Sequence, residues 1–182
     1  MKYLITFILS TVIHAQVVDW PAQNAVAYQA KKTMFFFKSV DVVGLNSNIG
    51  FSKSVLNSGR IISLNIPLES FKTDDKDRDL EVQSLLGVKK QKYLTFTSEI
   101  LFDPMYEKLQ TGTLSSMKGK INIAGEFYAV KLSLNYSEKY LFAEIESKLS
   151  SFNIKPPKVA LGVVAKAHDY IKLLARINRA DL

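Results

Sequence analysis

A short stretch of alternating apolar residues, 60–68, constrains the fold of this chain more than any other feature. In a β-strand, every second side chain points to the same face. The alternation therefore predicts a strand with one apolar face, which other parts of the chain must shield from water. The apolar side chains expected to share this face are Ile62, Leu64, Ile66 and Leu68.

The residues after this strand predict a short helix and then a second strand. Thr73 or Asp74 can cap the start of a helix, and Gly87 has the place of a residue just beyond a helix end. The second strand is expected to begin at Tyr93 and to run on to Phe102. The side chains expected to pack the helix on a sheet are Leu80, Leu85 and Leu86.

Further strand candidates, each bounded by turn residues, follow along the rest of the chain. Residues 127–136 and 141–149 alternate most clearly, and the polar turn 137–139 between them is typical of a hairpin. The weaker candidates are residues 33–43, 49–52, 109–114 and 119–124. This succession predicts an all-β fold, either a sandwich or a closed barrel. Residues 159–182 fit a helical period and a strand period equally, so periodicity leaves that segment open.

The first residues, 1–15, have the pattern of a secretory signal peptide that is cleaved on export. A positive charge at Lys2 precedes an apolar stretch from Leu4 to Ile13, which is too short to span a bilayer. We therefore expect an exported protein in the periplasm, with residues 16–182 as a single domain. Because the chain has no cysteine, an apolar core must stabilise this domain without disulfides.

The formal net charge is +7, which predicts a solvated basic surface. Basic residues are frequent between Lys155 and Arg179. Export argues against a nucleic acid as the partner of this charge, so we expect no nucleic-acid binding. An anionic membrane surface is the partner that such a basic segment would suit, in a transient contact.

The sequence lacks the residue patterns typical of enzymes and metal sites. It has two histidines, of which His14 lies in the expected signal peptide, so a metal site or a Ser-His-Asp triad would depend on His168. The acidic run 75–79 alternates as in a calcium loop, but Leu80 and Leu86 occupy the positions that require glycine and glutamate. We expect a solvated helix start there, and no catalysis, metal or cofactor.

The apolar residues leave two functional hypotheses open. The chain contains 11 Phe and 8 Tyr, which in a small β domain first fill the core. A barrel of about eight strands can instead leave an interior that holds one apolar ligand. Sequence periodicity does not distinguish an exported binding protein from an exported structural or interaction domain with a filled barrel.

Three motifs in fixed order carry a resemblance to a known family. The alternating strand leads into Ser70-Phe71-Lys72-Thr73, the pair Arg78-Asp79 follows at the expected helix, and Lys92-Tyr93 begins the next strand. In this order and spacing, residues 62–96 resemble the YceI-like family, bacterial periplasmic polyisoprenoid-binding proteins with a lipocalin-like barrel. The sequence differs from the family pattern at two places. Leu94 stands where the family has proline, and Glu81-Val82 stand where the family often has histidine.

The resemblance covers residues 33–177 and implies an antiparallel lipocalin-like β-barrel with one short helix after about the fourth strand. It also implies a loop and a final strand in the C-terminal segment, and an apolar tunnel for an isoprenoid or similar lipid. Each buried methylene would contribute about 0.8 kcal/mol, so such a ligand could bind without a catalytic group. The expected lining residues are Phe35, Phe37, Ile62, Leu64, Ile66, Phe96, Ile123, Val130 and Leu132.

Overall fold

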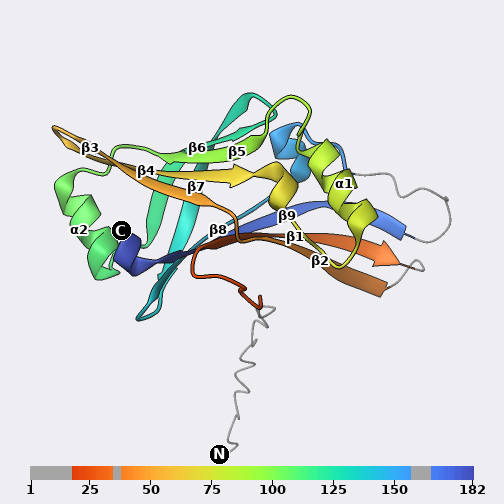
Figure 1. The fold of residues 1–182 in the computed structure, drawn as a ribbon, viewed down its shortest axis with the longest axis horizontal. Coiled ribbons are helices and arrows are strands. Elements are labelled where there is room, and N and C mark those ends of the chain that lie inside the picture. Colours follow the sequence, from red (N-terminus) through yellow and green to blue (C-terminus); the bar gives the residue numbers. More distant parts are fainter. Residues whose placement is uncertain (1–17, 35–37, 157–164) are drawn as a thin grey trace, which may run out of the picture.

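The computed structural model contains a nine-stranded antiparallel sheet that curls strongly into a half-barrel (Figure 1). It describes residues 18–34, 38–156 and 165–182. The predicted all-β, barrel-like fold is confirmed. The strands are β1 (Ala25–Met34), β2 (Lys38–Asn46), β3 (Gly50–Leu56), β4 (Gly59–Pro67), β5 (Tyr93–Ser98), β6 (Ser116–Ile123), β7 (Glu126–Tyr136), β8 (Tyr140–Ser147) and β9 (Ala165–Asn178).

The strand order shows how the sheet curls. Each strand from β3 to β8 pairs with the next strand in the chain, and β1 pairs with β9 on one side and with β2 on the other. The edges of the sheet are therefore β2 and β3. A main-chain bridge joins Leu45 of β2 to Lys72, with both N–H···O distances at 2.8 Å. The segment that follows β4 thus pairs with part of the exposed edge of β2.

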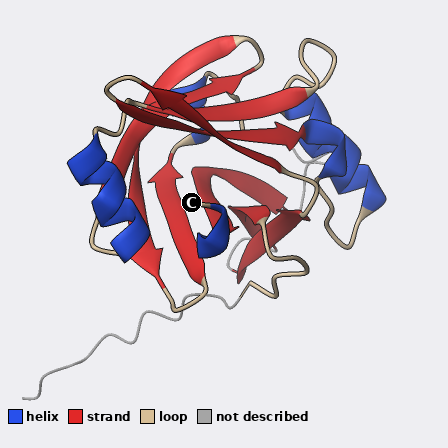
Figure 2. Cartoon of the chain, turned by 60° about the vertical axis from the view of Figure 1, so that its left-hand side comes forward, coloured by secondary structure: helices blue, strands red, loops and turns tan. Residues whose placement is uncertain are grey.

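Two short helices lie at opposite ends of the curled sheet (Figures 1 and 2). The helix α1 (Lys76–Leu85) follows β4 and a 3₁₀ turn, η1 (Leu68–Ser70), so the predicted short helix is confirmed. The helix α2 (Asp103–Thr111) follows β5. No helix of the described segments is long and apolar enough to cross a membrane.

The helix α2 corrects the sequence prediction, which placed strands up to Phe102 and again at residues 109–114. Strand β5 ends at Ser98, and α2 begins at Asp103. Pro104 suits the first helical turn, because N–H groups there have no acceptor within the helix and the N–H that proline lacks is not needed. Gly112 then ends the helix in the left-handed conformation, with φ 82°.

The C-terminal segment contains the long strand β9. It pairs with β8 on one side and with β1 on the other, which confirms the final strand implied by the resemblance. Residues 157–164, which include the start of the ambiguous segment, lie outside the described residues. The strand expected to continue to Leu149 instead ends at Ser147, and a second 3₁₀ turn, η2 (Leu149–Phe152), follows it.

Candidate apolar ligand-binding cavity

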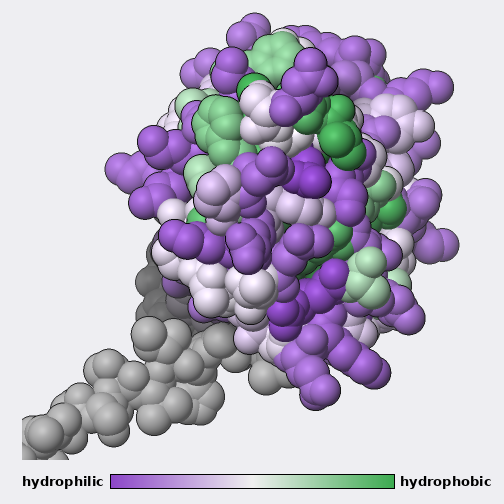
Figure 3. All heavy atoms as spheres, turned by 90° about the vertical axis from the view of Figure 1, so that its left-hand side faces the viewer, coloured by the Kyte–Doolittle hydropathy of each residue, from purple (hydrophilic) through white to green (hydrophobic). Residues whose placement is uncertain are grey.

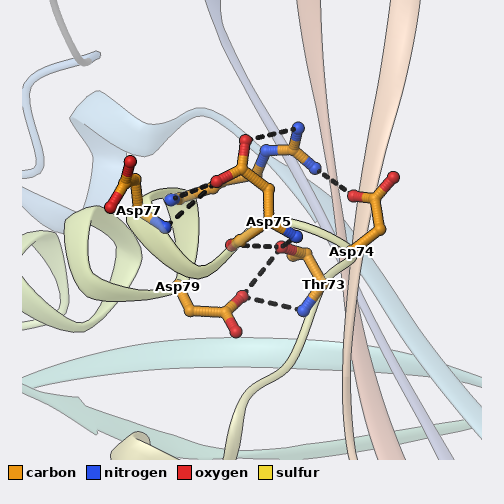
Figure 4. A network of polar contacts seen from close by, with 6 residues as sticks. Thr73, Asp74, Asp75, Asp77 and Asp79 are labelled. Atoms are coloured by element: carbon orange, nitrogen blue, oxygen red, sulfur yellow. Dashed lines mark hydrogen bonds and ion pairs between the residues drawn. The ribbon is translucent and has the colours of Figure 1, made fainter.

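A polar network fixes the start of α1 over one end of the barrel (Figure 4). Asp79 is buried, and its Oδ1 accepts hydrogen bonds from the N–H and the Oγ1 of Thr73, both at 2.8 Å. Arg78 Nη1 donates to Asp74 Oδ1 at 2.8 Å. Thr73, Arg78 and Asp79 belong to the motifs that carry the family resemblance. In this fold, these motif residues hold the helix in place.

Asp75 completes the helix start. Its Oδ1 accepts hydrogen bonds from the N–H groups of Asp77 and Arg78, so the predicted acidic, solvated helix start is confirmed. The hydrogen bond from the N–H of Arg78 is the main cause that lowers the pKa of the Asp75 carboxyl below its ordinary value. Within the described parts of the chain, no three His, Asp or Glu side chains gather closely enough to hold a metal ion.

A cavity of about 580 Å³ lies between α1 and the open end of the barrel. This volume is within the range of small-molecule sites, about 300–1,000 Å³. Helix α1 contributes Val82 and Leu85 to the wall, and Leu86, directly after the helix, contributes as well. The other apolar lining residues come from β1, β2, β5, β6, β9, η2 and the loops beside η1 and η2: Ala30, Val42, Phe71, Leu94, Ile123, Leu149, Phe152, Ile154, Ala167, Ile171 and Leu173.

Charged residues occupy the polar part of the cavity wall and balance one another. Three cationic and three carboxylate side chains contribute, together with His168, whose Nε2 is 2.7 Å from Thr33 Oγ1. Their formal charges cancel when the histidine is neutral. The cavity thus combines a large apolar wall with a polar edge that has no excess of either charge. The charged residues are Lys31, Lys32, Arg78, Asp75, Asp77 and Glu81.

Tyr28 places an unpaired hydroxyl near this cavity. The side chain is buried and meets the ring of Phe71 edge-on, with centroids 5.6 Å apart. It also covers Gly44 of β2, where an added Cβ would lie 2.2 Å from Tyr28 Cε1. The hydroxyl is buried without a hydrogen-bond partner among the described residues, and burial raises its pKa to about 12.

A second cavity, of about 50 Å³, lies deeper in the barrel. It shares Phe71, Leu94 and Leu173 with the larger cavity, so the two are neighbours. Its other lining residues are apolar and come from seven strands: Val26, Leu64, Ile66, Phe96, Ile121, Leu132, Ala143, Ile145, Leu174 and Ala175. The interior therefore narrows sharply away from α1.

The expected lining residues take different positions in this interior. Ile123 lines the larger cavity, while Ile62 and Val130 are buried but line neither cavity. Phe35 and Phe37 lie outside the described residues. The four expected residues that line the smaller cavity are Leu64, Ile66, Phe96 and Leu132.

Sequence reasoning did not identify the roof of the larger cavity or the wall around Tyr28 and η2. Leu85 and Leu86 were expected to pack α1 on the sheet; both pack against the core, and they also line the cavity. Leu80, expected to pack there too, is 64% exposed, so that prediction is wrong. The sequence signal for the wall around Tyr28 was Phe71. It belongs to the motif Ser70-Phe71-Lys72-Thr73, and its ring contacts that of Tyr28.

Basic residues of β9, and Arg179 directly after it, have partners within the fold. Lys172 Nζ lies 3.0 Å from Glu144 Oε2. Burial lowers the pKa of Lys172, but its hydrogen bond to Glu144 and the nearby carboxylates outweigh that effect and raise it. The guanidinium of Arg176 stacks on Tyr140, and Arg179 donates to the main-chain oxygen of Gln110. These cations stabilise the fold, and contact with an anionic membrane surface stays a prediction.

Several solved structures share this fold. BcnA from Burkholderia cenocepacia is 14% identical, with 82% of this chain and 94% of that chain covered and a TM-score of 0.53. A polyisoprenoid binding domain from Saccharophagus degradans, implicated in plant cell wall breakdown, is 11% identical, with 85% and 95% covered and a TM-score of 0.54. The YceI protein of Campylobacter jejuni is 16% identical, with 74% and 82% covered and a TM-score of 0.53. At these identities, the similarity shows the fold alone.

The sequence has no significant match among curated proteins. Its match to a protein family is extensive, however, because residues 19–178 correspond to the YceI-like domain. This range includes all nine strands, both helices and every described residue that lines the two cavities. The chain therefore belongs to the YceI-like family.

Proposed function

We propose that this protein binds an isoprenoid or a similar long apolar chain in the cavity beneath α1, without catalysing a reaction. The observation that carries the proposal is the cavity of about 580 Å³, whose wall is mostly apolar. Membership of the YceI-like family supports it. So does the fold shared with a domain described as polyisoprenoid binding.

Apolar contact alone supplies enough free energy for binding. An apolar chain of about twenty carbons gains roughly 16 kcal/mol when each methylene contributes about 0.8 kcal/mol. Association costs about 4–15 kcal/mol in lost freedom, so a net affinity remains without an ion pair or a covalent bond. The balanced charges at the polar edge are compatible with a ligand whose headgroup is neutral or zwitterionic.

We also propose that the protein is exported to the periplasm. The support is the signal-peptide pattern of residues 1–15, and export would bring the cavity close to membrane lipids. Mass measurement of the protein recovered from a periplasmic fraction tests this proposal. A mature chain that begins near Gln16 is expected, and an exported protein that retains residues 1–15 would contradict it.

Lipid extraction and native mass spectrometry of the purified protein test the binding proposal. Bound lipid is expected, and farnesol added to the stripped protein is expected to raise the melting temperature. A structural domain with a filled core would carry no lipid and show no shift. Repeated preparations without lipid, together with no response to farnesol, would overturn the proposal.

A matched pair of variants makes this test specific to the cavity. Ala30 lines the cavity, whereas Ala129 is exposed on β7. Ala30→Phe adds a ring inside the cavity and is expected to weaken binding at least about tenfold, because a ring displaces several methylenes. Ala129→Phe adds the same ring on the outside and is expected to bind as the unchanged protein does.

A further inference from the structure

We infer that Phe96, which lines the narrow space next to the binding cavity, acts as the floor that limits the bound apolar chain to about twenty carbon atoms. The inference rests on the proposed function, because it concerns the length of ligand that the same cavity accepts. It makes Phe96 a residue that determines specificity.

The interior narrows at Phe96. Leu94, two residues earlier on β5, lines both the cavity of about 580 Å³ and the smaller space of about 50 Å³, whereas Phe96 lines only the smaller space. One water molecule or methylene occupies about 30 Å³, so the smaller space holds only one or two such groups. Phe96 pairs with Leu64 on one side and with Ile121 on the other, and both neighbours line the same small space.

The ring of Phe96 is held in place by close packing. Its side chain is buried, with 3% exposed. It lies against Gly119 of β6, where an added Cβ would be 2.5 Å from Phe96 Cε2. Glycine is therefore required for the ring to lie across this strand. The floor is a packed side chain between two strands, and displacing it would disturb the sheet.

Beyond Phe96, described residues of the interior are tightly buried. Ile62, Leu101 and Leu109 are each at most 3% exposed. Tyr106 of α2 donates from Oη to the main-chain oxygen of Leu182 at 2.6 Å, which ties the second helix to the last residue. The outer face at this end is hydrophilic with separate apolar patches (Figure 3). A long ligand therefore has its way out at the α1 end.

The volume of the larger cavity sets the length of chain that fits. At about 30 Å³ per carbon group, 580 Å³ holds about twenty carbons, or four isoprene units. Carbons beyond that number must remain outside in water. Each methylene left in water rather than in an apolar environment lowers affinity by about fourfold.

Partitioning from detergent micelles measures this limit directly. The interiors of the micelles and of the cavity are both apolar. The free energy of a carbon group that fits into the cavity therefore changes little when it moves there from a micelle. Geraniol, farnesol and geranylgeraniol are therefore expected to partition into the stripped protein to a similar extent, as measured by native mass spectrometry. Solanesol, which is longer than the cavity, is expected to partition at least about a hundredfold less well.

Variants at the floor identify the residue that sets the limit. Phe96→Ala is expected to enlarge the smaller space that adjoins the binding cavity and to recover solanesol binding at least about tenfold relative to geranylgeraniol. Because loss of a buried ring can destabilise the core, Phe96→Leu is measured beside it and should change selectivity in the same direction. Val130→Ala, which removes buried atoms that line neither cavity, is expected to retain the original length preference.

The outcomes separate this inference from the proposed function. Equal partitioning of solanesol and geranylgeraniol into the unchanged protein would overturn the length limit and leave lipid binding intact. A length preference that Phe96→Ala, Phe96→Leu and Val130→Ala all retain would show that Phe96 does not set it. If none of the four alcohols binds, the proposed function fails, and the length limit fails with it.

Discussion

Thr73 donates two hydrogen bonds to one oxygen of Asp79, from its main-chain N–H and from its Oγ1, and both measure 2.8 Å. This contact connects the loop after η1 to the first turns of α1, the helix that roofs the cavity. Because Asp79 is buried, water cannot easily replace it as the acceptor. The position of the roof thus depends on a residue that supplies no surface to the cavity.

Replacing Asp79 is expected to destabilise the fold and to loosen the roof. Asp79→Ala leaves the main-chain N–H of Thr73 unpaired, whereas Thr73 Oγ1 can still donate to the main-chain oxygen of Asp75 at 3.0 Å. The substitution should lower the free energy of unfolding by about 1–3 kcal/mol in urea denaturation. Asp77→Ala, at an exposed position of the same helix turn, is the matched control and should change stability by less than about 0.5 kcal/mol. Equal effects of the two substitutions would contradict a special role for Asp79.

Tyr28→Phe is expected to raise the free energy of unfolding by about 1 kcal/mol, because it removes a buried hydroxyl that has no partner among the described residues. The matched control is Tyr128→Phe, which removes a hydroxyl that donates to the main-chain oxygen of Phe152 at 3.0 Å. That control should lower stability by about 1 kcal/mol. Thermal unfolding of both variants distinguishes the two cases. A similar loss in each would show that the Tyr28 hydroxyl is paired in solution.

Local sequence patterns predicted the parts of this fold that depend on local contacts. The buried face of residues 60–68 follows from the period of two, and Ile62, Leu64 and Ile66 are all buried. The start of α1 follows from an acidic turn that satisfies helix N–H groups, although Asp75 rather than Thr73 or Asp74 is the cap. Helix α2 was missed because Asp103-Pro104 was interpreted only as a strand break, whereas Gly112 marks the far end of a helix.

The depth and extent of the cavity could not be predicted from periodicity. Ile62 and Leu64 share one face of β4, yet only Leu64 lines a cavity, since their depth depends on how neighbouring strands are staggered. The packing of the Phe96 ring against Gly119 joins two strands that are separated in sequence by α2. Such contacts are fixed by tertiary packing, and alternation within a single strand does not encode them.

Acid is expected to weaken the start of α1 through Asp75. Its pKa lies below the ordinary value of 3.8 in the folded protein, chiefly because the N–H of Arg78 donates to it. A carboxyl group whose pKa is lower in the folded than in the unfolded chain stabilises the fold at pH values above its unfolded-state pKa. That contribution is lost as the pH falls through its folded-state pKa. Stability from this group should therefore be complete above about pH 5 and decline below 3.8.

Denaturation at several pH values between neutral and strongly acidic measures this contribution. Asp75→Asn keeps a side chain that can cap the helix but does not titrate, so its loss of stability in that range should be smaller. Asp77→Asn, on the exposed first turn of α1, should follow the unchanged protein. An identical pH dependence for Asp75→Asn and the unchanged protein would exclude Asp75 as a source of acid sensitivity.

Gly119→Ala is expected to destabilise the barrel by about 1–3 kcal/mol, because the interior has no room for one more methyl group at this position. The added Cβ would lie 2.5 Å from the ring of Phe96 and 2.5 Å from the main-chain oxygen of Thr97, so a side-chain rotation cannot relieve both contacts. Gly50→Ala is the matched control in a strand, since its nearest neighbour would lie at an ordinary 3.5 Å. Urea denaturation of both variants measures the difference. A loss at Gly119 no larger than that at Gly50 would mean that Phe96 can move aside, and a mobile Phe96 could not act as the floor of the cavity.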